Sequence, residues 1–111
     1  MLTVDELKKK ILPVAKKHNI EEIYLFGSYA RGEATIDSDI DLLLKVSKKA
    51  TFFSIAEFIV EAEETLGKTL DYILDSELLL KDNEYLAENI NRDKVLLCSR
   101  KDLKYNVKTA G

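Results

Sequence analysis

"FGSYARGEATIDSDIDLLL", residues 26–44, places a Gly-Ser pair and then two aspartates, Asp39 and Asp41, at the head of an apolar run. Residues two apart on a β-strand project from the same face, so the two aspartates are expected side by side, with alternate apolar residues opposite them. Two negative charges at the start of a buried strand repel each other. A divalent cation between them turns this repulsion into binding, because Mg²⁺ prefers carboxylate oxygens.

A third acid, Asp71, interrupts a later apolar run, "KTLDYIL", residues 68–74. If the two strands are neighbours, Asp39, Asp41 and Asp71 converge, and two metal ions held there would clamp the attacking and leaving oxygens of a phosphoryl centre. Taken singly, an aspartate at the start of a strand is usually a turn or cap residue, and Asp71 fits an edge-strand charge that blocks aggregation. The metal-site prediction therefore depends on the three acids occurring together.

The Gly-Ser pair upstream has the composition of a phosphate-binding turn. Gly27 directly follows a predicted strand, where a glycine lets the backbone approach a phosphate, and a short helix starting there would direct N–H groups at the anion. Ser28 adds a hydroxyl donor, and Arg31 adds a guanidinium able to grip a phosphate in a fork. We therefore expect Gly27, Ser28 and Arg31 to bind nucleotide phosphates.

Helical and strand patterns alternate along the rest of the chain. The expected helices cover residues 4–18, 52–67 and 83–90, and the expected strands cover residues 21–27, 39–46, 69–74 and 94–98. In the second helix the apolar residues expected near one face are Phe52, Ile55, Ala56, Ile59, Val60 and Ala62. This order indicates an α/β or α+β fold, with a small mixed β-sheet flanked by helices.

Composition indicates one ordinary globular domain. The chain has 111 residues, of which 46% are hydrophobic and 33% charged, and its net charge of −3 argues against stable nucleic-acid binding by this chain alone. No apolar run approaches the roughly 18 residues of a membrane span. The single cysteine, Cys98, cannot form an internal disulfide, which agrees with a cytoplasmic location. We expect a domain over residues 1–98 and a loose C-terminal tail over residues 99–111.

The motif "GSYARGEATIDSDIDLLL" resembles the signature of the DNA polymerase beta-like nucleotidyltransferase superfamily: a Gly-Ser pair, a short gap, Asp-x-Asp, and a later single Asp on a strand. It is most similar to the minimal nucleotidyltransferases, in which "GSxARG" and "SDxDL" recur, and the likeness extends over about residues 4–98. The resemblance implies the polymerase beta-like nucleotidyltransferase fold. Gly27 and Ser28 match the phosphate-binding pair of that family, and Arg31 matches the arginine of its "ARG".

The resemblance also implies a reaction, in which an acceptor hydroxyl attacks the α-phosphorus of a nucleoside triphosphate in line and pyrophosphate leaves. Asp39 and Asp41 would hold two Mg²⁺ ions, while Asp71 would complete the site of the metal that activates the acceptor and would take its proton. Ser28 would hold the β- and γ-phosphates, and Arg31 would offset charge on the departing pyrophosphate. ATP as the donor rests on the resemblance alone.

The acceptor is expected to come from another protein, because we find no part of the chain left over for an acceptor domain. Members of this branch are similar to antitoxins that transfer AMP to a tyrosine of a helical HEPN-domain RNase toxin and so neutralise it. Two alternatives stay open: the same chemistry on a small molecule or an unrelated protein, and a non-catalytic antitoxin that masks its partner by contact. Turnover of labelled nucleotide distinguishes them.

Overall fold

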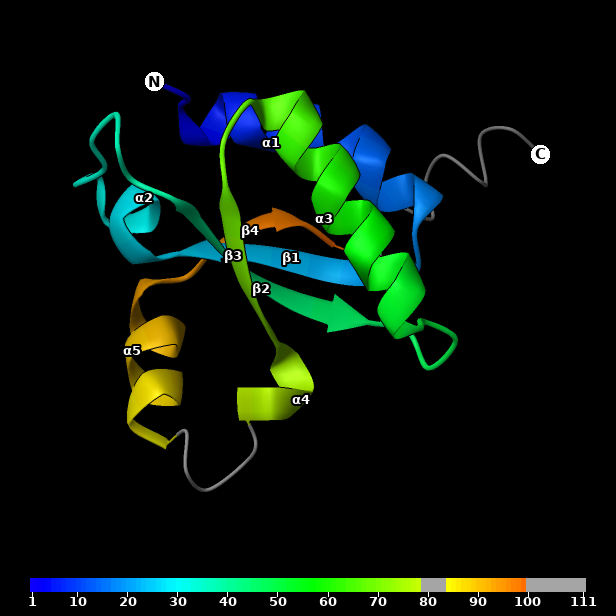
Figure 1. Ribbon diagram of the computed structural model, residues 1–111. Helices are drawn as coiled ribbons and strands as arrows, with labels where there is room; N and C mark the ends of the chain where they lie inside the picture. Colours follow the sequence, from blue (N-terminus) through cyan, green and yellow to red (C-terminus); the bar gives the residue numbers. More distant parts are fainter. Residues whose placement is uncertain (79–83, 100–111) are drawn as a thin grey trace.

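The strands form one mixed four-stranded β-sheet. The computed structural model describes residues 1–78 and 84–99, and within them the sheet has the order β3-β2-β1-β4 (Figure 1). Strand β1 is antiparallel to β2 and β4, whereas β2 and β3 are parallel. The strands are β1 (Ile20–Phe26), β2 (Ile40–Val46), β3 (Leu70–Leu74) and β4 (Val95–Cys98). The small mixed sheet predicted from the sequence is confirmed.

Helices cover both faces of this sheet. They are α1 (Val4–Lys17), α2 (Gly27–Arg31), α3 (Phe52–Leu66), α4 (Asp75–Leu78) and α5 (Glu84–Asp93). Helices α1 and α3 lie side by side on one face, and α4 and α5 lie on the other (Figure 1). The short helix α2 follows β1 without a break, so the Gly-Ser pair sits where the chain leaves the sheet.

Local signals in the sequence fix where the long helices begin. In front of α1, the Thr3 hydroxyl accepts a hydrogen bond from the Glu6 backbone N–H at 3.1 Å, and the Glu6 carboxylate accepts one from the Thr3 N–H at 3.0 Å. This reciprocal pair satisfies two amide groups that otherwise have no partner at a helix start. Thr51 and Ser54 form the same arrangement in front of α3. The helix α1 continues through the exposed Pro13.

Strand β2 is buried on both of its faces, which explains its run of consecutive apolar residues. Leu42 and its neighbours two residues away pack in the main core with α1 and α3. Leu43 points the other way and packs with Leu78 of α4 and Ile90 of α5. Because strand residues alternate, Asp41 lies on the same side of the sheet as Leu43. The acidic end of β2 therefore faces the layer formed by α4 and α5.

The predicted core face of the second helix is wrong in part. Phe52 is 86% exposed, Val60 is 55% exposed and Ala56 is exposed as well. The side of α3 that faces the core carries Ile55, Phe58, Ala62 and Leu66. Apolar residues lie on two neighbouring stripes of this helix, so periodicity alone does not determine which one packs. The stripe that contains Phe58 packs in the core, which leaves an apolar stripe exposed.

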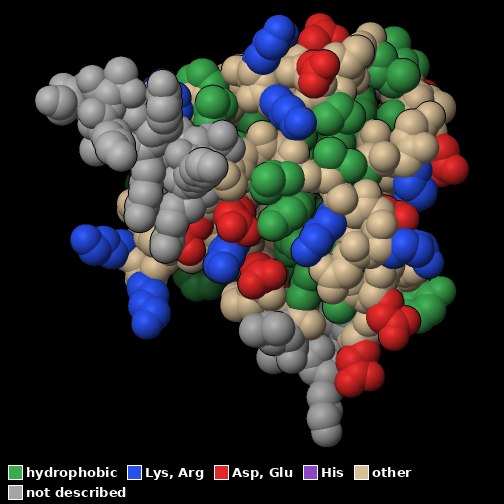
Figure 2. Space-filling view, turned by 180° about the vertical axis from the view of Figure 1, so that it is seen from behind, with side chains coloured by type: hydrophobic (Ala, Val, Ile, Leu, Met, Phe, Trp, Pro, Cys, Tyr) green, Lys and Arg blue, Asp and Glu red, His purple; other side chains and the backbone are tan. Residues whose placement is uncertain are grey.

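Two predictions lie partly outside the described residues: the start of the third predicted helix at Asn83, and the tail beyond Ser99. Within residues 1–78 and 84–99, no helix has both the length and the apolarity needed to span a membrane. Figure 2 shows acidic and basic side chains interspersed on the face that it presents. On that face, neither charge forms a continuous patch.

Candidate active site

The predicted convergence of aspartates is built into the strand register. Strands β2 and β3 are parallel neighbours, and Asp41 is paired with Asp71 across them. Side chains at paired positions of parallel strands project from the same face, so these two carboxylates are side by side. Asp39 lies two residues before Asp41, just outside β2. Three acids separated by up to 32 positions in the sequence thus meet at one end of the sheet.

The three acids act on one another electrostatically. The pKa of Asp41 is raised above its ordinary value, first because the side chain is partly buried, and then because the negative charges of Asp71 and Asp39 disfavour a further charge. The positive charge of Arg31 acts in the opposite direction and lowers the same pKa. A cation placed among these carboxylates would relieve the repulsion.

The chemistry of these donors fits a hard divalent cation. Asp39 and Asp71 are exposed and Asp41 is half-buried, so carboxylate oxygens are accessible from solvent. Across residues 1–78 and 84–99, no group of three His, Cys, Asp or Glu side chains is arranged so that it could hold a metal ion by itself. An open set of carboxylates suits Mg²⁺, which keeps several waters and completes its coordination with phosphate oxygens. Asp39, Asp41 and Asp71 are the residues that would hold it.

Position 27 requires a glycine, because the Asp41 side chain lies where a Cβ would be. The φ angle of Gly27 is +73°, a left-handed conformation that residues with a Cβ rarely adopt. A Cβ added to Gly27 would collide with the Asp41 carboxylate and lie 3.0 Å from its Cγ. The sequence interpretation gave this glycine the role of admitting a phosphate. In the structure, the glycine makes room for the Asp41 carboxylate.

The other two predicted phosphate ligands lie on α2. Ser28 is partly exposed, and in the part of the chain that the structure describes its hydroxyl makes no hydrogen bond, so it is free to bind a ligand. Arg31 ends α2, and its guanidinium is already in contact with two carboxylates. Its Nε lies 2.8 Å from Glu33 Oε1, and its Nη1 lies 3.6 Å from Asp93 Oδ2.

Sequence reasoning missed both carboxylates that contact Arg31. Glu33 follows it by two positions, where an opposite charge on a polar loop is too common to attract attention. Asp93 lies at the end of α5 and is brought to Arg31 only by the packing of α5 beside α2. No local signal marks it, because the pair exists only in the folded chain.

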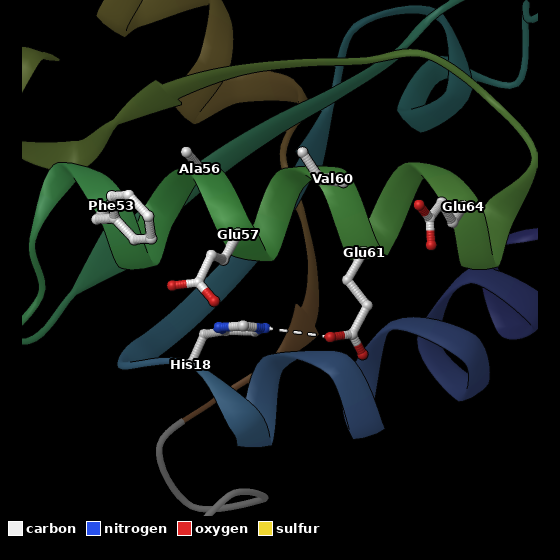
Figure 3. Close-up of a pocket in the computed structure, with 7 residues that line it drawn as sticks. All are labelled: His18, Phe53, Ala56, Glu57, Val60, Glu61 and Glu64. Atoms are coloured by element: carbon white, nitrogen blue, oxygen red, sulfur yellow. Dashed lines mark hydrogen bonds and ion pairs between the residues drawn. The ribbon is translucent and has the colours of Figure 1, made fainter.

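A hollow of about 400 Å³ lies apart from these residues, on the outer side of α3 (Figure 3). It is lined by His18, Phe53, Ala56, Glu57, Val60, Glu61 and Glu64. His18 Nε2 lies 3.4 Å from Glu61 Oε1, and Lys17 Nζ lies 2.8 Å from Glu61 Oε2. The only histidine of the chain therefore joins the end of α1 to α3. None of the three aspartates lines the hollow.

Known proteins share both the sequence pattern and the fold. A family model described as "Polymerase beta, Nucleotidyltransferase" matches residues 9–103. The protein adenylyltransferase MntA of Thermococcus cleftensis is 36% identical over 83 residues, which are 70% of this chain and 83% of that protein.

Two solved complexes contain chains with a similar fold. One is a toxin-antitoxin with AMP-PNP, with a TM-score of 0.66 and 21% identity over 93% of this chain and 83% of that chain. The other is a tri-AMPylated Shewanella oneidensis HEPN toxin with its MNT antitoxin, with a TM-score of 0.62 and 19% identity over 97% and 84% of the two chains. At these identities the likeness shows the fold, while the match to the family model covers most of the sequence. The chain therefore belongs to the polymerase beta nucleotidyltransferase family.

Proposed function

We propose that this nucleotidyltransferase is a metal-dependent protein adenylyltransferase that moves AMP from ATP to a tyrosine of a HEPN-domain RNase toxin, and so acts as its antitoxin. The observation that carries the proposal is the pairing of Asp41 with Asp71 across β2 and β3, with Asp39 beside them. A relative that is 36% identical is named a protein adenylyltransferase, which supports AMP as the transferred group. The similar fold in toxin-antitoxin complexes supports the partner class.

The residues divide the work by position. Asp39 and Asp41 would hold two Mg²⁺ ions, which when bound supply positive charge to the phosphates and to the acceptor oxygen. Asp71, beside Asp41, orients the acceptor and takes its proton. Ser28 and the amides at the start of α2 hold the β- and γ-phosphates. Arg31, at the other end of α2, offsets negative charge on the leaving group.

The transfer itself exchanges one P–O bond for another. A tyrosine oxygen forms a bond to the α-phosphorus as the bond from that phosphorus to the bridging oxygen of the β-phosphate breaks. The hydroxyl proton goes to Asp71, and pyrophosphate leaves with the electron pair of the broken bond. In-line attack requires a fixed acceptor oxygen, so transfer by the chain alone should be slow or negligible.

The proposed partner is a basic protein, because a chain with a net charge of −3 attracts positive surfaces. AMP attached near an RNase active site adds bulk and negative charge where RNA must bind, which would silence the toxin. A cytoplasmic location and the lack of stable nucleic-acid binding by this chain remain parts of the proposal.

Labelled ATP tests the proposal. The chain, Mg²⁺ and the HEPN RNase purified with it should move label from the α-phosphate of ATP to the RNase, while label on the γ-phosphate should leave with pyrophosphate. Asp39→Asn should remove the transfer. An RNase that is inhibited only while bound and carries no label would show a masking antitoxin. Label on a small molecule, without any protein partner, would show the other alternative.

A further inference from the structure

The guanidinium of Arg31 interacts with three carboxylates. Its positive charge lowers the pKa of Asp41. Its Nε lies 2.8 Å from Glu33 Oε1, and its Nη1 lies 3.6 Å from Asp93 Oδ2. A guanidinium has five N–H donors, and within residues 1–78 and 84–99 these contacts leave Nη2 and one hydrogen of Nη1 available for a phosphate.

Asp93 is the most fixed member of this group. Its side chain is 17% exposed, against 44% for Arg31 and 64% for Glu33. Its second oxygen, Oδ1, accepts a hydrogen bond from Arg92 Nε at 3.2 Å. The helix that carries it is anchored one turn earlier, where Ile90 packs against Leu43 of β2. The position of the Asp93 carboxylate is therefore set by helix packing and by its side-chain contacts.

We propose that Asp93 is a positioning residue for nucleotide binding, holding Arg31 so that its free N–H groups face the phosphates of ATP. This inference rests on the proposed function, in which Arg31 contacts those phosphates. A long side chain on a five-residue helix would otherwise have to be ordered when ATP binds, and that ordering reduces affinity. With Asp93 present, much of this order exists before ATP arrives.

The direction in which ATP affinity changes when the Asp93 charge is removed distinguishes positioning of Arg31 from simple electrostatic repulsion. ATP is a polyanion and the chain is already negative, so removal of one carboxylate near the site should strengthen binding if only charge matters. Positioning predicts the reverse. Asp93→Asn keeps the size of the side chain while it weakens the contact with Arg31, so binding of Mg·ATP should become weaker.

The experiment is a double-mutant cycle on the full chain, measured as the Kd of Mg·ATP by titration calorimetry at fixed ionic strength. Asp93→Asn should raise the Kd about threefold to tenfold, within the range found for charge-assisted contacts. Arg31→Ala should raise it further, and Asp93→Asn added to Arg31→Ala should change it less than about twofold. Asp93→Glu should restore part of the affinity. Glu88→Gln, exposed on the same helix, is the matched control and should leave the Kd unchanged.

Three results would overturn the inference. Unchanged or tighter binding by Asp93→Asn would show that Asp93 does not position Arg31. If Asp93→Asn raises the Kd of Mg·ATP by the same factor in the unaltered chain and in the Arg31→Ala variant, Asp93 has a general structural role that does not act through Arg31. If Arg31→Ala itself binds Mg·ATP normally, the part of the proposed function that assigns Arg31 fails as well, and this outcome is distinct because it does not depend on Asp93. Thermal unfolding of each variant identifies losses that come from folding alone.

Discussion

Replacing Asp41 by asparagine should make the metal-free protein more stable while it removes metal binding. In the folded chain Asp41 is half-buried, and its neighbour in the adjacent parallel strand is Asp71. Strands lie about 5 Å apart, and two unit charges at that distance repel by about 0.8 kcal/mol in water and by about 3 kcal/mol at an effective dielectric constant of about 20. Asp71 is exposed, so the value near the lower limit applies. Asn has nearly the same shape and no charge. We expect a gain of about 1 kcal/mol in unfolding free energy, which corresponds to about 4–8 °C in Tm for a domain of this size.

The pH dependence of this gain provides a second check. Because folding raises the pKa of Asp41, the folded state binds its proton more tightly than the unfolded state, and stability falls as the pH rises from the ordinary aspartate pKa of about 3.9 to the raised value. The gain from Asp41→Asn should therefore be complete at pH 7 and should shrink as the pH falls towards 4.

Urea unfolding in EDTA, at several pH values, measures this gain. The matched control is Asp37→Asn, at an exposed position in the loop before β2, and it should change stability little. In a separate series without EDTA, added Mg·ATP should stabilise the unaltered chain and not the Asp41 variant. A loss of stability in the Asp41→Asn variant at pH 7, or a gain independent of pH, would refute the account of a strained carboxylate cluster.

Three further changes test other parts of the site. Gly27→Ala and Gly67→Ala impose similar backbone strain, because φ is +73° and +67° at the two positions, but only a Cβ on residue 27 meets Asp41. Gly27→Ala should therefore lower the unfolding free energy by about 1 kcal/mol more than Gly67→Ala does, and it alone should weaken Mg·ATP binding. Equal losses of stability in the two variants would show that the collision with Asp41 does not occur. Ser28→Ala should slow transfer less than the aspartate changes do, because backbone amides still hold the phosphates, and steady-state rates compare them. Asp39→Asn should slow transfer on the order of a thousandfold, whereas an undiminished rate would remove it from the metal site.

Much of the fold was predictable because its signals are local. The capping box at Thr3 and Glu6 marks the start of α1, and the left-handed Gly67 marks the end of α3. The acids were predictable for a different reason, since two carboxylates on an otherwise apolar strand conflict with burial. Asp41 and Asp71 each break such a run, and the fold pairs them. The metal that this arrangement suits remains a prediction.

Features that depend on packing were not predictable. The choice of core face on α3 depends on how Phe58 fits between α1 and the sheet, and both candidate stripes are apolar. The contact between Arg31 and Asp93 joins residues 62 positions apart through the placement of α5. The collision at Gly27 involves the side chain of a neighbouring strand. In each case the residue that determines the outcome is distant in the sequence, so a local stretch of sequence does not reveal the contact.

The most direct test of the central claim is the intact mass of the proposed HEPN RNase partner after incubation with this chain, ATP and Mg²⁺. The account predicts that the partner gains one or more AMP units on a tyrosine, that it stays inactive as an RNase after separation, and that EDTA or Asp41→Asn prevents the gain. A partner of unchanged mass that regains full RNase activity after separation would contradict it.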